Sequence, residues 1–407
     1  MVLADVEQRI RHHDRSHKEL QSAQAHQQVA PTIIRGPLVS ALISSLPAGP
    51  LDIIGDVHGE IHALEAILDR LDQRKPRGAR PHLVFLGDLV DRGPDSMAVV
   101  DRVAGLVRDG RASCILGNHE LNLIRDRKRS GNHWFWGVRS EEWNHSAGDH
   151  VIEGVFDSRP ATDSERSRAL EFFRTLPIAL HRVDLRVVHA AWHASGIQAL
   201  QECTDLTDAL ARSDADAAAI PPALRALCKA EIAALKRARI GLKNPSTPPP
   251  ALPALAEAAV IDQNDHHLSV VTSGPEEVRP GRPEWRAGRW RVVRRQRWWD
   301  APVSMPTIFG HYWRLRLPSA DASRTRLFDD TGPTAWLGPD RNAFCVDFSV
   351  GRRYQSRVSG QPPSGGFREA LGALRWTGPH QPSALWFDDL DQPLEVPSPG
   401  TASHTVR

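Results

Sequence analysis

The sequence predicts an α/β protein in which parallel strands alternate with helices. Apolar stretches typical of short buried strands begin at Leu51, His82 and Ala112, and a helical pattern follows each of them. Connections of this length between successive strands are right-handed crossovers, which pair the strands in parallel. A polar turn also follows each strand. Because the carboxyl ends of parallel strands open to one side of a sheet, we expect the three turns to face one pocket.

The first turn reads Gly-Asp-Val-His-Gly and follows the strand that begins at Leu51. It supplies Asp56 and His58, which are metal-ligand residue types. After it, apolar residues recur at helical spacing, at Ile61, Leu64, Ile67, Leu68 and Leu71. An Asp in such a turn can also serve only to cap the helix, so one turn is weak evidence for a metal site.

The second and third turns repeat this arrangement, as GDLVDRG at 87–93 and GNHE at 117–120. Asp56, Asp88 and Asn118 follow one another at intervals of 32 and 30 residues. Helix capping explains neither the histidines nor the Asp-Arg-Gly sequence, so three such turns in succession indicate a metal site. Together, the two later turns supply Asp88, Asp91, Arg92, Asn118 and His119.

The composition is that of an ordinary globular protein. Of the 407 residues, 25% are charged and 41% are hydrophobic, and the formal net charge of +2 demands no charged partner. The four cysteines form no C-x-x-C motif, which argues against a zinc ribbon or a disulfide framework and is typical of a reducing compartment. The sequence shows neither a signal-peptide core nor an apolar run of membrane-spanning length, so we expect a cytoplasmic protein without membrane contact.

The pattern divides the chain into three parts. Residues 1–48 are polar and rich in His and Gln, and they predict a loosely ordered N-terminal arm. Residues 49–376 hold the strand and helix patterns and are expected to form one domain, with residues 199–255 as a helical cap insertion. Residues 377–407 are rich in Pro and Ser, and we expect a loose C-terminal tail.

The three turns resemble those of the calcineurin-like metallophosphoesterases. The most similar branch is the phosphoprotein-phosphatase group, which includes serine/threonine phosphatases and diadenosine tetraphosphate hydrolases. This family adds two later histidines at strand ends, and His189 in VVHAAW and His311 in FGHYW stand in matching places. One departure is Ala191, where the family usually has Gly. The resemblance implies a four-layer α/β/β/α sandwich of two mixed sheets, with a bimetal site at the strand ends.

The resemblance also implies which side chains hold the metals. The first ion is expected on Asp56, His58 and Asp88, and the second on Asp88, Asn118, His189 and His311. Two divalent cations about 3.5–4 Å apart neutralise the charge of a phosphate ester and form a metal-bound hydroxide near neutral pH. Mixed nitrogen and oxygen ligands favour Mn, with Fe or Zn as alternatives.

By the same resemblance, three residues act on the substrate. Arg92 offers a planar fork of donors that matches two phosphate oxygens. His119 is placed to protonate the leaving oxygen, and Asp91 is placed to orient the imidazole. The family's second phosphate-binding arginine has three candidates in this chain, which are Arg182, Arg239 and Arg314.

These residues predict a binuclear phosphoesterase whose partner is a phosphorylated protein or a nucleotide. A serine/threonine phosphoprotein phosphatase is the first interpretation, with a dinucleoside polyphosphate hydrolase or a nucleic-acid-end phosphatase as alternatives. A catalytically silent binding module is the non-enzyme alternative, and the intact ligand set argues against it. The run Arg279–Trp299 interleaves Arg with Trp, which suits stacking on nucleic acid. A strand with Trp inside and Arg outside is the favoured interpretation of that run.

Overall fold

The computed structural model describes residues 42–400 with gaps. The gaps are residues 77, 79, 130, 139–155, 217–219, 243, 287–288, 317–326, 329–330 and 360–368. The described residues divide into two compact units. We call residues 43–192, 271–273 and 297–400 the sheet unit, and residues 193–270 and 274–296 the insertion unit.

The sheet unit contains a six-stranded mixed sheet in the order β15-β14-β13-β2-β3-β4. Its strands are β2 (Leu51–Ile54), β3 (His82–Phe85), β4 (Ala112–Cys114), β13 (Gly372–Trp376), β14 (Ser383–Phe387) and β15 (Leu394–Val396). β2, β3 and β4 pair in parallel, with Ile53 opposite Val84 and Phe85 opposite Cys114. The three strands read from the sequence are therefore confirmed, as is their parallel pairing.

A second mixed sheet of the same unit has the order β1-β5-β6-β11-β12. Its strands are β1 (Ile43–Ser45), β5 (Ala179–Arg182), β6 (Leu185–Val188), β11 (Thr307–Phe309) and β12 (Ala343–Cys345). β6, β11 and β12 run parallel to one another. The residues that directly follow β6 and β11 therefore lie at the same end of this sheet.

The two sheets share one apolar core. A single buried cluster draws on both sheets, with members that include Leu51, Ile53, Val84, Leu374, Leu180, Val187, Ile308 and Phe344. Each fully buried side chain of this kind contributes about 1.5–3 kcal/mol relative to an exposed one. Two mixed sheets packed through a common core confirm the expected architecture.

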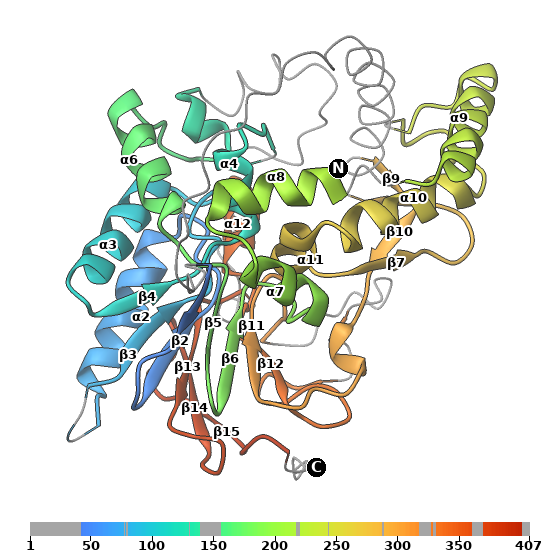
Figure 1. The fold of residues 1–407 in the computed structure, drawn as a ribbon. Helices are drawn as coiled ribbons and strands as arrows, with labels where there is room; N and C mark the ends of the chain where they lie inside the picture. The colour runs from blue at the N-terminus through green and yellow to red at the C-terminus, as the bar shows by residue number, and fades with distance from the viewer. Residues whose placement is uncertain are drawn as a thin grey trace, which may run out of the picture. The chain divides into compact units, whose positions relative to one another are not determined.

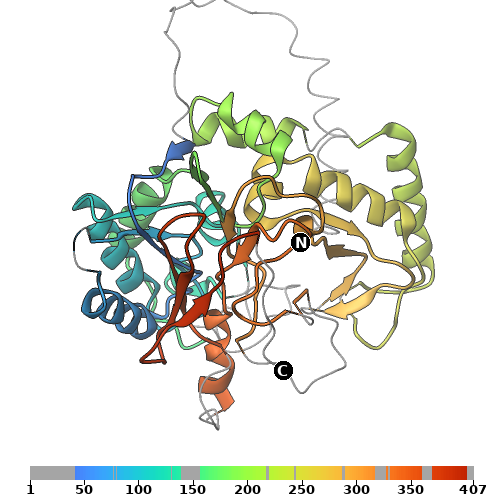
Figure 2. The ribbon, with the colours of Figure 1, turned by 90° about the horizontal axis from the view of Figure 1, so that it is seen from below.

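Helices flank the six-stranded sheet on its outer side. Figures 1 and 2 show α2 (Ile61–Gln73) and α3 (Ser96–Arg108), in blue and cyan, beside the strands β2, β3 and β4. The apolar stripe of α2 is buried, as its helical spacing predicts, while α3 contacts β4 and α6 (Asp163–Arg174). The other helices among the described residues of this unit are α4 (Asn118–Ile124), η1 (His133–Trp136), η2 (Trp298–Asp300), η3 (Val350–Arg352) and α12 (Arg353–Ser359).

The prediction of a loose tail at 377–407 is wrong for residues 383–396, while residues 401–407 lie outside the described residues. Strands β14 and β15 complete the six-stranded sheet, and β14 pairs antiparallel with β13 so that Trp386 lies opposite Ala373. The expected arm at 1–48 also extends too far, because Ile43 of β1 pairs with Ala179 of β5; residues 1–41 lie outside the described residues. Flanking polar residues and prolines hide these short strands, whose stability comes from partners far away in the sequence.

The insertion unit contains both helices and strands, and it extends beyond the range 199–255. Its helices are α7 (Ala194–Gln201), α8 (Leu206–Asp216), α9 (Pro222–Arg237), α10 (Pro253–Asn264) and most of α11 (His267–Ser273). Its strands are β7 (Glu276–Val278), β8 (Glu284–Arg286), β9 (Arg289–Arg291) and β10 (Val293–Arg295). α9 and α10 pack through Leu224, Cys228 and Leu255 in a separate buried cluster. Among the described helices of the chain, none has the length and apolar character needed to cross a membrane.

Candidate metal centre

The turns after β2 and β3 are locked to each other by backbone hydrogen bonds. His58 and Asp88 adopt left-handed backbone conformations, with φ of 50° and 45°. Such conformations are costly for residues other than glycine and persist only where the surroundings fix them. Here the amides of Val57 and His58 both donate to the carbonyl oxygen of Asp88, at 3.1 and 2.8 Å. The strained backbone therefore belongs to the candidate metal ligands themselves, His58 and Asp88.

Glu120 ties the second turn to the third. Its buried carboxylate accepts the amides of Asp88 at 2.9 Å, Leu89 at 2.8 Å and Gly117 at 3.0 Å. Burial and the nearby charge of Asp88 raise the pKa of Glu120 to about 7. Sequence reasoning gave Glu120 no role of its own. The signal for one is the capping-box position three residues after Gly117.

Asp88 lies at the centre of the candidate site. Its Oδ2 is 3.4 Å from Nε2 of His189 and 3.8 Å from Nε2 of both His58 and His119. Its Oδ1 accepts the backbone amide of His119 at 2.9 Å. Two groups with metal-ligand spacing share this carboxylate, one formed with His58 and His119 and the other with His189 and His311. A shared carboxylate is the feature that a two-metal site requires.

The imidazoles are oriented by backbone carbonyls. Nδ1 of His58 donates to the carbonyl of Val90 at 3.1 Å, and Nδ1 of His189 donates to that of Leu86 at 2.7 Å. Both hydrogen bonds turn Nε2 toward Asp88 and fix the tautomer that leaves Nε2 able to bind a metal. Asn118 is half-buried, and its Oδ1 is 3.3 Å from Nε2 of His189. The structure thus brings five of the expected ligands together, which are His58, Asp88, Asn118, His189 and His311.

Asp56 and His311 come from the two different sheets and meet through the backbone. Oδ2 of Asp56 accepts the amide of His311 at 3.0 Å, and His311 has a left-handed φ of 66°. Oδ1 of Asp56 is buried and accepts no hydrogen bond from any described residue. A Cβ at Gly310 would lie 2.1 Å from that oxygen, so only glycine fits beside it. Asp56 is near the clusters, although its oxygens are not among the two groups with metal-ligand spacing.

The electrostatics of the site fit two divalent cations. Burial raises the pKa of Asp56 well above its usual value, and the neighbouring carboxylate of Asp347 raises it further. Burial alone would lower the pKa of His189, but Asp88 and Asp56 raise it to about 10. These carboxylates therefore attract positive charge into a buried space. Together with the unpartnered Oδ1 of Asp56 and the mixed nitrogen and oxygen donors, they match what Mn, Fe or Zn would take.

Burial would also raise the pKa of Asp88, but the imidazoles of His189 and His119 hold it well below its usual value. The carboxylate that joins the two groups is therefore ionised. Burial lowers the pKa of His58 well below its usual value, and the positive charge of Arg92 lowers it further. His58 is neutral, which is the state in which an imidazole binds a metal.

The three residues expected to act on the substrate form one hydrogen-bonded chain. Nδ1 of His119 lies 2.5 Å from Oδ2 of Asp91, and the other oxygen of Asp91 accepts the indole N–H of Trp134 at 2.7 Å. The two guanidinium nitrogens of Arg92 donate to Nε2 of His58 at 2.9 Å and to Nε2 of His119 at 3.1 Å. Arg92 therefore directs both donors of its fork at the metal-ligand group formed by His58, Asp88 and His119.

The three candidates for a second phosphate-binding arginine lie in other settings. Arg182 is paired with Asp184 and with backbone carbonyls. Arg314 is fully buried and donates to the carbonyls of Cys345 and Ala335, so it holds the loop after His311 in place. Arg239 belongs to the insertion unit. Arg314 is therefore excluded as a phosphate ligand, because no substrate can reach it.

Two further residues of the site were missed by sequence reasoning. Asp347 is buried, and its carboxylate accepts the amides of Trp313 at 2.9 Å and Ser349 at 2.8 Å. Trp313 lies two residues after His311, with its ring 4.7 Å from the guanidinium carbon of Arg92. The available signal for Asp347 is a carboxylate that ends the apolar run Ala343–Val346, an unusual place for a charge.

In the segment Arg279–Trp299, described arginines pair with acidic residues and a tryptophan is buried, as in the interpretation of a strand with Trp inside and Arg outside. Arg279 pairs with Glu284, and Arg294 pairs with Glu277 across the antiparallel strands β7 and β10. Trp299 is fully buried and stacks on Phe309. Arg279, Arg294 and Trp299 therefore contact other residues of the protein itself.

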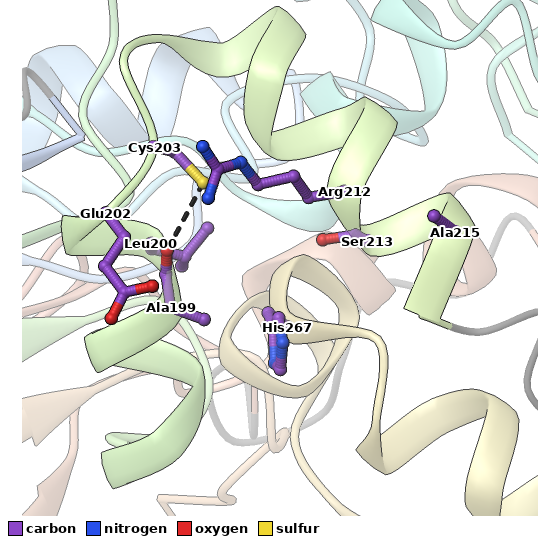
Figure 3. Close-up of a pocket in the computed structure, with 8 residues that line it drawn as sticks. All are labelled: Ala199, Leu200, Glu202, Cys203, Arg212, Ser213, Ala215 and His267. Atoms are coloured by element: carbon purple, nitrogen blue, oxygen red, sulfur yellow. Dashed lines mark hydrogen bonds between the residues drawn. The ribbon is translucent and has the colours of Figure 1, made fainter.

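A hollow of about 360 Å³ lies within the insertion unit. Figure 3 shows its lining, which comes from α7, α8, α11 and the segment that follows α7. Arg212 at its edge pairs with Asp208, and the thiol of Cys203 donates to the carbonyl of Ala199 at 3.3 Å. It contains none of the expected site residues.

The geometry agrees with what a family comparison finds. Residues 49–207 match the calcineurin-like phosphoesterase family. This segment holds the three turns and His189, while His311 lies beyond it. The resemblance read from the motifs is confirmed over these residues.

The curated relatives that this chain resembles include bis(5'-nucleosyl)-tetraphosphatases. The asymmetrical bis(5'-nucleosyl)-tetraphosphatase of Oceanobacillus iheyensis is 32% identical over 145 residues, which cover 34% of this chain and 54% of the relative. The symmetrical enzyme of Janthinobacterium sp. is 33% identical over 151 residues, which cover 36% and 47%. The chain thus spans about half the length of the curated relatives it matches. A solved structure described as a diadenosine tetraphosphatase covers 88% of this chain at 16% identity. Its TM-score of 0.34 is too low to support a conclusion about this chain.

Proposed function

We propose that this chain is a metal-dependent phosphoesterase that hydrolyses dinucleoside polyphosphates such as diadenosine tetraphosphate. The observation that carries the proposal is the position of Asp88, whose Oδ2 lies within 3.8 Å of the Nε2 atoms of three histidines. The choice of substrate is supported by the names of the curated relatives, which are bis(5'-nucleosyl)-tetraphosphatases. The phosphoprotein interpretation, placed first from sequence, becomes the competing one.

Two divalent ions would be held by Asp88 together with the imidazoles around it. His58 and Asp56 would serve one ion, while His189, His311 and Asn118 would serve the other. Such a pair neutralises phosphate charge and activates a water molecule for in-line attack. We expect Mn, with Fe or Zn as alternatives.

The chain's own residues would bind and protonate the substrate. The fork of Arg92 presents two donors to one phosphoryl group, and its guanidinium stays charged at any working pH. Asp91 holds Nδ1 of His119, so Nε2 faces the site and would carry the proton of a general acid once a bound phosphate draws Arg92 away from it. That proton can pass to the leaving oxygen as the P–O bond breaks.

The test of this proposal is a comparison of substrates at saturating Mn. Diadenosine tetraphosphate, a phosphoserine peptide and p-nitrophenyl phosphate are assayed side by side for kcat/KM. We expect the dinucleotide to have the highest value, because it presents several phosphates to the cations of the site. A higher kcat/KM for the peptide would favour the phosphoprotein interpretation, and no hydrolysis of any of the three would reject the phosphoesterase assignment.

A further inference from the structure

Trp313 has a backbone conformation that a bulky residue rarely adopts. Its φ is 59°, in the left-handed region, where a large side chain is a true outlier. The buried carboxylate of Asp347 holds it there by accepting its amide at 2.9 Å. Strain of this kind is retained where the placement of a side chain has a function. The question is therefore what the indole of Trp313 does.

The indole of Trp313 lies at the rim of the candidate metal centre and stays accessible. The residue is 37% exposed, whereas Trp134, Trp299 and Trp376 are fully buried. The guanidinium carbon of Arg92 lies 4.7 Å from its ring centre, and that of Arg352 lies 6.0 Å away. One aromatic surface is thus placed beside two cations, next to the expected ligand His311.

We propose that Trp313 is the platform on which the base of a nucleotide substrate stacks, while Arg92 and Arg352 bind its phosphates. This inference rests on the proposed function and names the residue that selects a nucleotide. An exposed ring beside guanidinium groups matches the two chemical parts of a nucleotide, which are a flat aromatic base and an anionic chain. Stacking of one base on an aromatic residue is typically worth about 5- to 150-fold in binding.

Arg352 has a defined place in this arrangement. It lies in η3, directly after Gly351, where a Cβ would come within 2.4 Å of the ring of His58. The segment therefore approaches the first metal-ligand group as closely as its backbone allows. A cation at this position can reach a phosphate that extends beyond Arg92, which is what a polyphosphate chain would provide.

The competing role for Trp313 is to hold Arg92 in position without touching the substrate. The two roles differ in what they predict for a substrate that has phosphates but no base. A stacking platform affects only substrates that carry a base. A support for Arg92 affects every phosphate substrate alike, because all of them use the same fork.

The experiment measures kcat and KM of the Mn-loaded full chain for diadenosine tetraphosphate and for inorganic tripolyphosphate. In Trp313→Ala, we expect KM for the dinucleotide to rise about 5- to 150-fold, and KM for tripolyphosphate to change less than about threefold. Trp313→Phe keeps an aromatic face and should recover most of the affinity. The control is Trp192→Ala, because Trp192 also lies 4.8 Å from a guanidinium, that of Arg186, and has no assigned role in the site.

Calorimetric binding of ADP and of pyrophosphate gives the same comparison without turnover. Trp313→Ala should weaken the binding of ADP and leave that of pyrophosphate unchanged. Equal losses on both ligands would overturn the stacking platform and assign Trp313 to the support of Arg92. Unchanged binding of ADP would overturn it as well. If the wild-type protein binds ADP through Trp313 but hydrolyses no phosphate ester, the proposed function fails and the nucleotide site stands.

Discussion

Replacement of His119 by Asn tests whether this residue is the general acid. The imidazole is fixed, because Nδ1 lies 2.5 Å from Asp91 and Asp91 is itself held by the indole of Trp134. An alkoxide is a poor leaving group and requires a proton as the P–O bond breaks. Nitrophenolate is stable without one. His119→Asn keeps a polar side chain of similar reach but cannot donate a proton in the same way.

The expected loss depends on the leaving group. A general acid contributes about 10²–10⁴ in rate where the leaving group requires it, which corresponds to about 2.7–5.4 kcal/mol of activation free energy. We therefore expect kcat for glycerol phosphate to fall by at least about 10², and kcat for p-nitrophenyl phosphate by less than about 10. His119 also accepts a hydrogen bond from Arg92 at 3.1 Å. Its loss should raise KM for both substrates alike.

The assay measures kcat on both substrates at saturating Mn, with the metal content of each variant checked. Asp91→Asn is the second variant, and it tests the residue that orients the imidazole. An amide has one acceptor oxygen for two donors, so it cannot serve both Trp134 and Nδ1 of His119, and it should give the same bias more weakly. Equal losses of kcat on both substrates, or a loss of metal from His119→Asn, would show that His119 serves the metal site and that the general acid lies elsewhere.

The same geometry supports three further predictions. Asp88→Asn should lose both metal ions while Asp56→Asn disturbs mainly one, so elemental analysis that finds full occupancy in Asp88→Asn would contradict the shared carboxylate. Glu120→Ala leaves three buried amides without an acceptor, each worth about 1–3 kcal/mol, and urea unfolding should show a loss of several kcal/mol that Glu120→Gln only partly avoids. Hydrogen bonds from Arg159 and Thr162 lower the pKa of Glu165 from 4.5 to about 2, so its stabilisation is complete above pH 4.5 and is lost toward pH 2. Glu165→Gln should lower the urea midpoint at pH 7 and match the wild type near pH 2; a constant difference across this range would refute that assignment.

The parts of the fold that local patterns determine could be predicted from sequence. β2, β3 and β4 are continuous apolar runs followed by amphipathic helices, and their residues pair as the βαβ rule requires. The same rule placed the three polar turns at one end of the sheet. His58, Asp88 and His119 therefore could be grouped before their distances were known.

The parts that depend on distant partners could not be predicted. β14 is a five-residue strand flanked by prolines and polar residues, and it is stable because it adds to β13, whose own partner is β2. Trp313 and Asp347 are 34 residues apart, and only the folded chain brings the carboxylate to the strained amide. Local sequence patterns bring together the turns of successive parallel strands, but they do not show which loops from distant parts of the chain meet.

The proposed activity requires two metal ions shared by Asp88, which together enable this chain to hydrolyse a dinucleoside polyphosphate. The decisive experiment is a titration of metal-free protein with Mn, in which bound metal and the hydrolysis of diadenosine tetraphosphate are followed together. We expect activity to rise until about two ions are bound per chain, and we expect Asp88→Asn neither to bind the pair nor to show this rise. Full activity in the metal-free protein, or a wild-type rate in Asp88→Asn, would contradict the shared metal pair.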